Sequence, residues 1–472
     1  MKSTSIIAVA TILCSLEVWA YSLEDYLKEV QTKNSGMQAA TRSIKGTTLR
    51  MSEAYLYERP NFFLNSQYLN DQRPTSTPSF QGSQTLRTTF QTGVMQQFKF
   101  GGKATVSYNI AKTTINGASP AALPQSNFFD MAPQLELTQS LWKNWLGREL
   151  QASEDMTEGQ AELIQNSEKY RYKQLLMNAE LNYWRLALAQ QTVKVQAESL
   201  ERSTKIKDWN YARFHKGLSD ESDYLQSTSA LAARQIDYQA ALLEQKSAAR
   251  AFNTLRELQA DMVREELITP HDGELMSLSI PVRAGNREDV EAALAQKKIA
   301  QAQAAMGEEK NKPTLELYGS YSLNGRAATS GPALSESITQ DHPAAVIGVR
   351  FNTPLDLGNL ADNKDGYALE KIAANYNYER KLFEQEREWK DLLNRFKDYQ
   401  DRFLLIQKLE QAQKEKLAKE KVRLNRGRST TFQILQFEQD YANAQLLKLK
   451  NEADLVATYA QLKLFSGATY EQ

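Results

Sequence analysis

Two long stretches of the chain, residues 134–269 and 355–472, contain none of its 12 prolines. They are also poor in glycine. Because proline breaks a helix and interior glycine destabilises one, such stretches predict very long helices. Each helix would have roughly seventy residues and a length of ~100 Å at 1.5 Å per residue. That length exceeds the diameter of any compact domain of this mass.

The chain also repeats itself, because three segments recur in the same order. The pairs are residues 59–68 and 312–321, 135–141 and 349–355, and 213–226 and 423–436. The first two pairs alternate apolar and polar residues with period two, which predicts strands. One unit therefore runs from about residue 22 to 257, and the second from about 286 to 465.

Between these segments the spacing of apolar and small residues changes to alternating steps of three and four. The positions are Leu176, Ala179, Tyr183, Leu186, Gln190, Val193, Ala197 and Leu200 in the first unit, and Trp389, Leu392, Phe396, Tyr399, Phe403 and Ile406 in the second. A sustained 3.5-residue repeat predicts a left-handed coiled-coil seam against a partner helix.

The third repeated segment predicts a chain reversal in each unit. Gly217 and Gly427 can adopt the left-handed conformation that ends a helix. Ser219 and Ser429 follow and are expected to cap the returning helix. Each unit is thus predicted to hold a helical hairpin.

An alternating segment around Gly101 and Gly102 has no counterpart in the second unit. Aromatic and aliphatic residues from Phe98 to Ile110 alternate there with polar ones, which is typical of transmembrane barrel strands. On the strands alone, the edge of a soluble β-sandwich fits about equally well. The repetition, the long helices and the N-terminal export signal described next favour membrane strands. Whether the extra hairpin widens a barrel or forms a separate loop stays open.

The N-terminus predicts export. Lys2, the apolar run from Ile6 to Leu16 and small or modest residues before Ala20 are typical of a signal peptide cleaved after Ala20. Cys14 is the only cysteine, and Leu13 before it disfavours lipidation. The mature chain then lacks thiols, and no later apolar run is long enough for a transmembrane helix.

Charge and motif content exclude several functions. The chain has 57 basic and 57 acidic residues, which argues against nucleic-acid binding. His215, His271 and His342 lack metal-ligand spacing, so no metal or other cofactor is expected. Gly101 to Ala104 lacks essential parts of a phosphate-binding loop, and there is no Gly-x-Ser-x-Gly motif. We therefore expect no catalytic residues and no enzyme.

With its tandem units of helix, strands and helical hairpin, the chain resembles the TolC-like outer-membrane factor family over essentially its whole mature length. The most specific matches are residues 213–226, 423–436, 139–142, 353–356 and 22–27. The resemblance implies an α+β membrane protein, in which three tandem-repeat protomers form a transmembrane β-barrel continued by a long periplasmic α-helical barrel. Two strands per unit would give a trimer 12 strands, and the extra hairpin departs from that pattern.

This resemblance divides the chain into nine segments. They are a signal peptide (1–20), a helix (21–58), barrel strands with the extra hairpin (59–146), helical hairpin 1 (147–258), a connector (259–285), a second helix (286–312), barrel strands (313–358), helical hairpin 2 (359–466) and a tail (467–472).

The implied function is an outer-membrane duct in a Gram-negative bacterium, serving tripartite efflux or type I secretion. Its partners would be two further copies of the chain, outer-membrane lipid, a periplasmic adaptor and an inner-membrane pump. The hairpin tips would dock the adaptor, through Gly217, Leu218, Ser219, Gly427, Arg428 and Ser429. The alternative is that these residues only reverse the chain. Residues 408–428 carry eight basic and three acidic side chains, which supports a contact role or a solvated face.

The resemblance also implies a periplasmic constriction at Asp223, Gln226, Gln433 and Gln436. Glutamine in place of aspartate predicts a polar opening with weak cation selectivity, unless the glutamines pack between helices. The alternative for the whole protein is a soluble periplasmic coiled-coil structural or adaptor protein. The sequence does not separate an efflux duct from a protein-secretion duct.

Overall fold

The computed structural model describes residues 20–283 and 285–466. The predicted signal peptide up to residue 19, with Cys14, and the tail 467–472 lie outside the described residues. The chain divides into two compact units. Unit 1 comprises the described parts of residues 1–44, 167–288 and 382–472, and unit 2 comprises residues 45–166 and 289–381.

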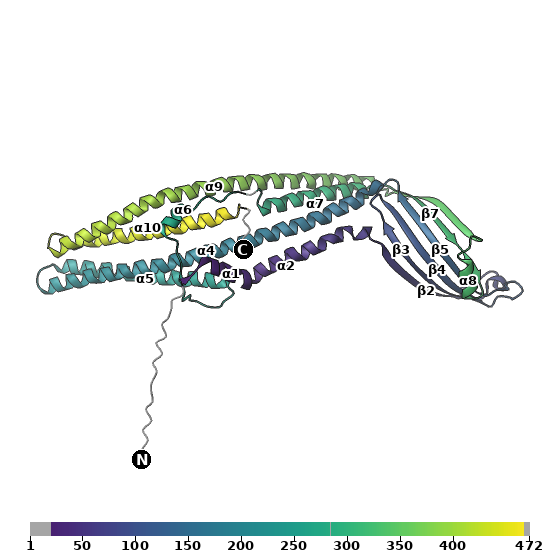
Figure 1. Cartoon of the computed structure of the whole chain (residues 1–472), viewed down its shortest axis with the longest axis horizontal. Coiled ribbons are helices and arrows are strands. Elements are labelled where there is room, and N and C mark those ends of the chain that lie inside the picture. Colours follow the sequence, from purple (N-terminus) through teal and green to yellow (C-terminus); the bar gives the residue numbers. More distant parts are fainter. Residues whose placement is uncertain (1–19, 284, 467–472) are drawn as a thin grey trace, which may run out of the picture. The chain divides into compact units, whose positions relative to one another are not determined.

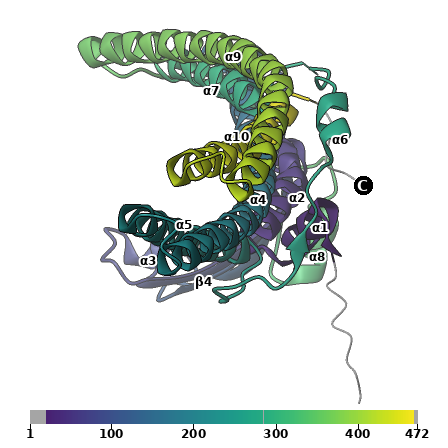
Figure 2. The ribbon, with the colours of Figure 1, turned by 90° about the vertical axis from the view of Figure 1, so that its left-hand side faces the viewer.

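Unit 1 is built on two helical hairpins. The first joins α4 (Arg148–His215, 68 residues) to α5 (Glu221–Leu255), and the second joins α9 (Leu357–Asn425, 69 residues) to α10 (Thr431–Lys463). Figure 1 shows the returning helix of each hairpin lying along its partner, and Figure 2 looks onto the hairpin ends. The N-terminal parts of α4 and α9 belong to unit 2. The proline-free stretches therefore form the long helices that they predict.

The predicted seam residues form much of the core of unit 1. Leu176, Ala179, Tyr183 and Leu186 are buried in one apolar cluster with residues of the N-terminal helix and of α5. Leu392, Phe396 and Phe403 are buried in a second cluster. The later seam positions of α4, from Gln190 to Leu200, are only half-buried. Ala189, Gln196 and Ser199 are buried there instead, so the buried stripe of α4 lies one residue before the predicted seam.

The segment expected as one helix over residues 21–58 consists of several elements. These are β1 (Ala20–Tyr21), α1 (Leu23–Lys33), α2 (Ser35–Arg50) and the 3-10 helix η1 (Met51–Glu58). The helix breaks at Asn34, whose backbone is extended and whose side-chain amide donates to the Leu255 carbonyl oxygen at 3.0 Å. The connector contributes β6 (Glu266–Leu267), which pairs in parallel with β1, and α6 (Asp272–Ser277).

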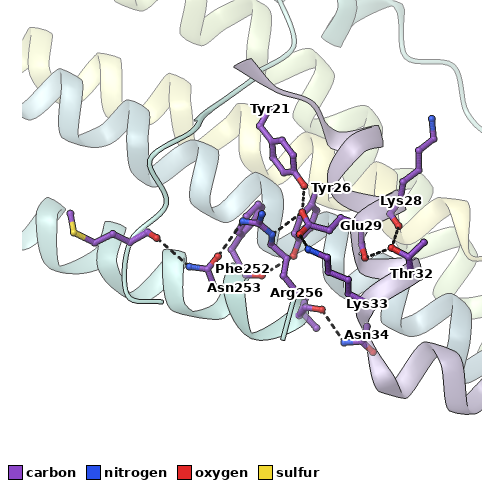
Figure 3. A network of polar contacts seen from close by, with 12 residues as sticks. Tyr21, Tyr26, Lys28, Glu29, Thr32, Lys33, Asn34, Phe252, Asn253 and Arg256 are labelled. Carbon is purple, nitrogen blue, oxygen red and sulfur yellow. Dashed lines mark hydrogen bonds and ion pairs between the residues drawn. The ribbon is translucent and has the colours of Figure 1, made fainter. Parts of the chain in front are cut away.

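A polar network fastens α1 to the end of α5 (Figure 3). Glu29 accepts hydrogen bonds from Lys33, from Arg256 at 2.9 Å and from the Tyr21 hydroxyl. Although burial opposes ionisation, these donors lower the pKa of Glu29 to about 2. The Arg256 guanidinium also lies over the rings of Tyr21 and Phe252. The N-terminal helix is therefore held by charge as well as by apolar contacts.

Unit 2 contains a seven-stranded antiparallel sheet. Its strands are β2 (Asn61–Asp71), β3 (Gln84–Gln97), β4 (Gly102–Asn116), β5 (Asn127–Ser140), β7 (Thr314–Leu323), β8 (Gly325–Ala327) and β9 (Pro343–Asn352). The order is β2-β3-β4-β5-β7-β9, and the short β8 pairs with β5 (Figure 1). The helical elements of this unit include α3 (Pro78–Gln81), η2 (Trp145–Gly147), α8 (Ser330–Glu336) and most of α7 (Glu288–Lys310).

The two faces of this sheet differ in polarity. One register row joins Phe62, Val94, Val106, Leu135 and Tyr321 across β2, β3, β4, β5 and β7, and all five side chains are exposed. On the opposite face, Asp130 binds Arg326 and Glu316 binds Arg350. Period-two alternation thus gives an exposed apolar face and a polar face.

No helix within residues 20–283 and 285–466 is both long and apolar enough to cross a bilayer.

Candidate functional site

The two hairpin tips have the same backbone geometry. Gly217 and Gly427 have φ of +71° and +69°, in the left-handed region. In the first tip, the Leu218 N–H donates to the Arg213 carbonyl oxygen at 2.9 Å, and in the second Arg428 donates to Arg423 at 2.9 Å. These six-to-one hydrogen bonds define a Schellman motif at each helix end. The predicted left-handed conformation of the two glycines, which ends each long helix, is therefore confirmed.

Each tip is also clamped by an arginine side chain. The Arg213 guanidinium donates to the Leu218 carbonyl oxygen at 3.0 Å, and Arg423 donates to the Arg428 carbonyl oxygen at 3.4 Å. Both arginines open the repeated motif, but sequence reasoning assigned them no role. Their equal spacing before the glycine was the available signal.

The predicted capping residues are wrong by one position. Residue Asp220 precedes α5 and Thr430 precedes α10, and the Thr430 hydroxyl accepts from the Gln433 N–H at 3.3 Å. The Ser219 hydroxyl donates instead to Asp223 at 2.9 Å. Asp220 and Thr430 have the extended backbone of an N-cap residue, with ψ of 155° and 157°, so each helix begins one residue later than predicted.

Buried polar contacts support the second tip. Glu420 is buried, accepts from the Ser429 hydroxyl at 2.5 Å and forms an ion pair with Arg423 at 3.3 Å. The Thr431 hydroxyl donates to the buried Asn210 at 3.0 Å, which joins the start of α10 to the end of α4. Sequence reasoning missed Glu420 and Asn210, which occupy equivalent positions before the two arginines.

The ends of the tips are open to solvent. Gly217, Leu218, Gly427 and Arg428 are exposed, whereas Ser219 and Ser429 are half-buried by their contacts with the helices. Leu218 retains 63% of its accessible surface. An exposed leucine in one tip and an exposed arginine in the other are available to a partner protein.

The predicted constriction residues lie in the first two turns of the returning helices α5 and α10. Gln226, Gln433 and Gln436 are exposed, and Asp223 is half-buried by its hydrogen bond from Ser219. Gln436 donates to Asp440 on its own helix at 2.9 Å. The glutamines therefore do not pack between helices of this protomer.

A buried ion pair, which the sequence did not reveal, begins two residues after Gln436. Glu438 on α10 is 1% exposed and accepts from the Arg202 guanidinium at 2.7 Å. Burial raises the pKa of Glu438 although Arg202 opposes the shift, and its second carboxylate oxygen has no hydrogen-bond partner among the described residues. This pair fixes the register between the two hairpins.

A cavity of 660 Å³ lies among α4, α6, α9 and α10. On its wall, the Lys448 ammonium is 3.1 Å from Asp272, 3.6 Å from Glu410 and 3.7 Å from Glu452. Three carboxylates thus share one cation. Burial is the main cause that raises the pKa of Glu452 to about 7.

Replacing Glu452 with glutamine is expected to stabilise the protein at pH 8 but not at pH 4.5. The folded-state pKa lies above the ordinary value of 4.5, so the folded protein loses stability as the pH rises from 4.5 through 7, and the loss is complete above that range. After allowance for solvent screening, the gain at pH 8 is about 2 kcal/mol. Thermal melting at the two pH values measures it. Glu415→Gln, at an exposed position of α9, is the control. Equal melting shifts for Glu452→Gln at both pH values would contradict this assignment.

No protein-family model matches the sequence, and no curated protein sequence matches it either. Solved structures do match. The chain is similar to CusC, whose crystal structures concern folding and transmembrane channel formation, with a TM-score of 0.66, 13% identity and coverage of 94% of this chain and 92% of CusC.

Two further solved structures match over the same share of this chain. The CmeC outer membrane channel of Campylobacter jejuni has a TM-score of 0.66 and 15% identity over 94% of this chain and 85% of CmeC. The outer membrane protein VceC of Vibrio cholerae has a TM-score of 0.65 and 14% identity over 94% of this chain and 96% of VceC. The chain therefore has the fold of these outer-membrane proteins. The resemblance predicted from the sequence is confirmed at the level of the fold.

Proposed function

We propose that three copies of this chain form a duct through the outer membrane of a Gram-negative bacterium. The sheets of unit 2 would form its transmembrane barrel, and the helical hairpins of unit 1 would form a periplasmic tube. The likeness in fold to channel proteins over 94% of the chain supports this assignment.

The observation that carries the proposal is the exposed apolar face of the sheet. Phe62 is 72% exposed, Ile347 81% and Val349 63%, and all three lie on that face. Soluble monomers rarely expose a continuous apolar surface that extends across a whole sheet. Lipid would cover it, and the polar face would line water. This surface argues against a soluble periplasmic coiled-coil protein.

The ends of the sheet supply the reason for a trimer. Strands β2 and β9 form the edges of the described sheet. In lipid, their open backbone groups would cost several kcal/mol each, so a membrane sheet must close. One protomer has too few strands to close around water, and pairing of β2 with β9 of a neighbouring copy closes it.

The exposed hairpin tips suggest where partner proteins would bind the duct. Leu218 and Arg428 would contact a periplasmic adaptor that connects the duct to an inner-membrane pump. The pump would select the substrate, in either efflux or type I secretion. Planar-bilayer recording of the purified protein tests the duct directly. Stepwise single-channel currents are expected, and their absence from protein that inserts into liposomes would overturn the proposal.

Replacing both Gln433 and Gln436 with aspartate is expected to increase cation selectivity. In a trimer the six added carboxylates would surround the exposed constriction positions and attract cations. The reversal potential in a tenfold salt gradient should shift towards that of a cation-selective pore. Gln411→Asp, at an exposed position of α9, is the matched control. An unchanged reversal potential would place the constriction elsewhere.

A further inference from the structure

The two repeats contribute different numbers of long strands to the sheet. The second repeat supplies β7 and β9, whereas the first supplies β2, β3, β4 and β5. The additional pair, β3 and β4, is the hairpin around Gly101 and Gly102. It lies between β2 and β5 in the strand order, not beside the sheet.

The inserted hairpin is paired along its length. Strand β3 has 14 residues and β4 has 15, so both are as long as β5 or longer. The pairs of β3 with β2 run from Asn61–Met95 to Asp71–Thr85. The pairs of β4 with β5 run from Gly102–Gln139 to Thr114–Asn127. A loop lying outside a barrel would not have both of its flanks paired in this way.

The hairpin also continues both faces of the sheet. Val94 and Val106 pair with each other and lie in the exposed apolar row between Phe62 and Leu135. On the opposite face, Gln91 pairs with Asn109, and their neighbours Asn65 and Gln134 bind them through side-chain hydrogen bonds. The insertion therefore has the polarity of a barrel strand pair.

The turn of the hairpin is fixed to the base of the sheet. A Cβ atom on Gly147 would lie 1.6 Å from the Lys99 carbonyl oxygen, so only glycine permits this approach. The Lys99 ammonium forms ion pairs with Glu58 at 2.9 Å and Glu154 at 3.5 Å. These contacts join the turn to the segments that enter β2 and leave β5.

We propose that β3 and β4 are barrel strands, so that three copies close an 18-stranded barrel through β2–β9 pairing between copies. This inference rests on the proposed trimeric duct. The two edge strands have 11 and 10 residues, which suits full pairing. Six long strands from each copy give 18, compared with 12 if each repeat supplied two.

The additional strands determine which solutes the barrel admits. Barrel diameter grows about linearly with strand number, so 18 strands give a backbone diameter of roughly 36 Å and 12 strands roughly 24 Å. Inward-pointing side chains narrow these barrels to openings of roughly 26 Å and 14 Å. The membrane portion would thus pass bulky solutes, such as a small folded protein, that a 12-stranded barrel excludes.

Electron cryomicroscopy of the wild-type trimer and of a deletion of residues 84–116 tests this inference. Ser83 donates its N–H to Asn116 at 2.8 Å, so residues 83 and 117 are close enough to be joined. Direct pairing of Phe62 with Leu135 would preserve the two faces. The wild-type barrel should be about 1.5-fold wider than that of the deletion variant. A threefold wild-type particle with 12 strands would overturn the 18-stranded barrel but not the trimeric duct. Wild-type particles without threefold tubes would overturn both.

A second measurement does not depend on the deletion variant folding. In a Cys14→Ser background, Phe90→Cys and Gln91→Cys place a fluorophore on the apolar and polar faces of β3. Lipid-borne quenchers should reduce the emission at position 90 several-fold and leave position 91 almost unchanged. Equal quenching at both positions would overturn the assignment of β3 to the barrel wall.

Discussion

Replacing Gly427 with valine is expected to reduce export at least tenfold while the trimer stays assembled. Gly427 has a φ of +69°, and a valine there costs of order 1–2 kcal/mol in the left-handed region. A Cβ atom added to Gly427 would have no atom of residues 20–283 or 285–466 within 4 Å outside its chain neighbours, so the cost is conformational and local to the tip. The two largest buried clusters of unit 1 are distant from Gly427 in sequence and keep the helices folded.

The measurement is substrate export from cells, together with trimer content on native gels. Gly366→Val is the matched control, because Gly366 lies in α9 with an ordinary helical φ and open space around it. The control should export normally. If Gly427→Val also exports normally at equal trimer content, the tip is a chain reversal without a docking role.

Replacing Leu135 with arginine is expected to prevent stable insertion of the barrel. Leu135 lies on the exposed apolar face of β5, and arginine near the bilayer midplane costs about 2–4 kcal/mol per copy. In a trimer the charge is introduced three times. Assembly in lipid vesicles, followed by protease protection, measures the effect.

Gln134→Arg is the control at almost the same depth. Gln134 lies on the polar face and accepts a hydrogen bond from Asn109 at 3.1 Å. Losing this bond costs about 1 kcal/mol, and the new charge would face water. Insertion should therefore be largely retained. Equal loss for both variants would contradict the assignment of the two faces.

Much of the fold could be predicted because its signals are local and repeated. The positive φ of Gly217 and Gly427 follows from glycine at the end of a long helical pattern. The strands predicted in the repeated segments 59–68 and 312–321 follow from period-two alternation. The first segment begins β2, and the second forms most of β7. The duplication strengthens each of these predictions, because both the strand pattern and the glycine at the helix end occur in both units.

The remaining features depend on contacts between distant segments. Alternation around Gly101 predicts a hairpin, but it does not state which strands flank it. Arg202 and Glu438 are 236 residues apart, and their pairing depends on the register between α4 and α10. The helix caps are predicted one residue too early because each tip offers two adjacent residues of capping type, Ser219 and Asp220 in the first tip and Ser429 and Thr430 in the second.

Electron microscopy of the mature protein extracted from membranes tests the central claim most directly, because it requires no knowledge of the substrate. The proposed duct predicts tubes with threefold symmetry that are released only by detergent. Thin rods without threefold symmetry, released from the periplasm without detergent, would contradict it and make the chain a soluble coiled-coil protein.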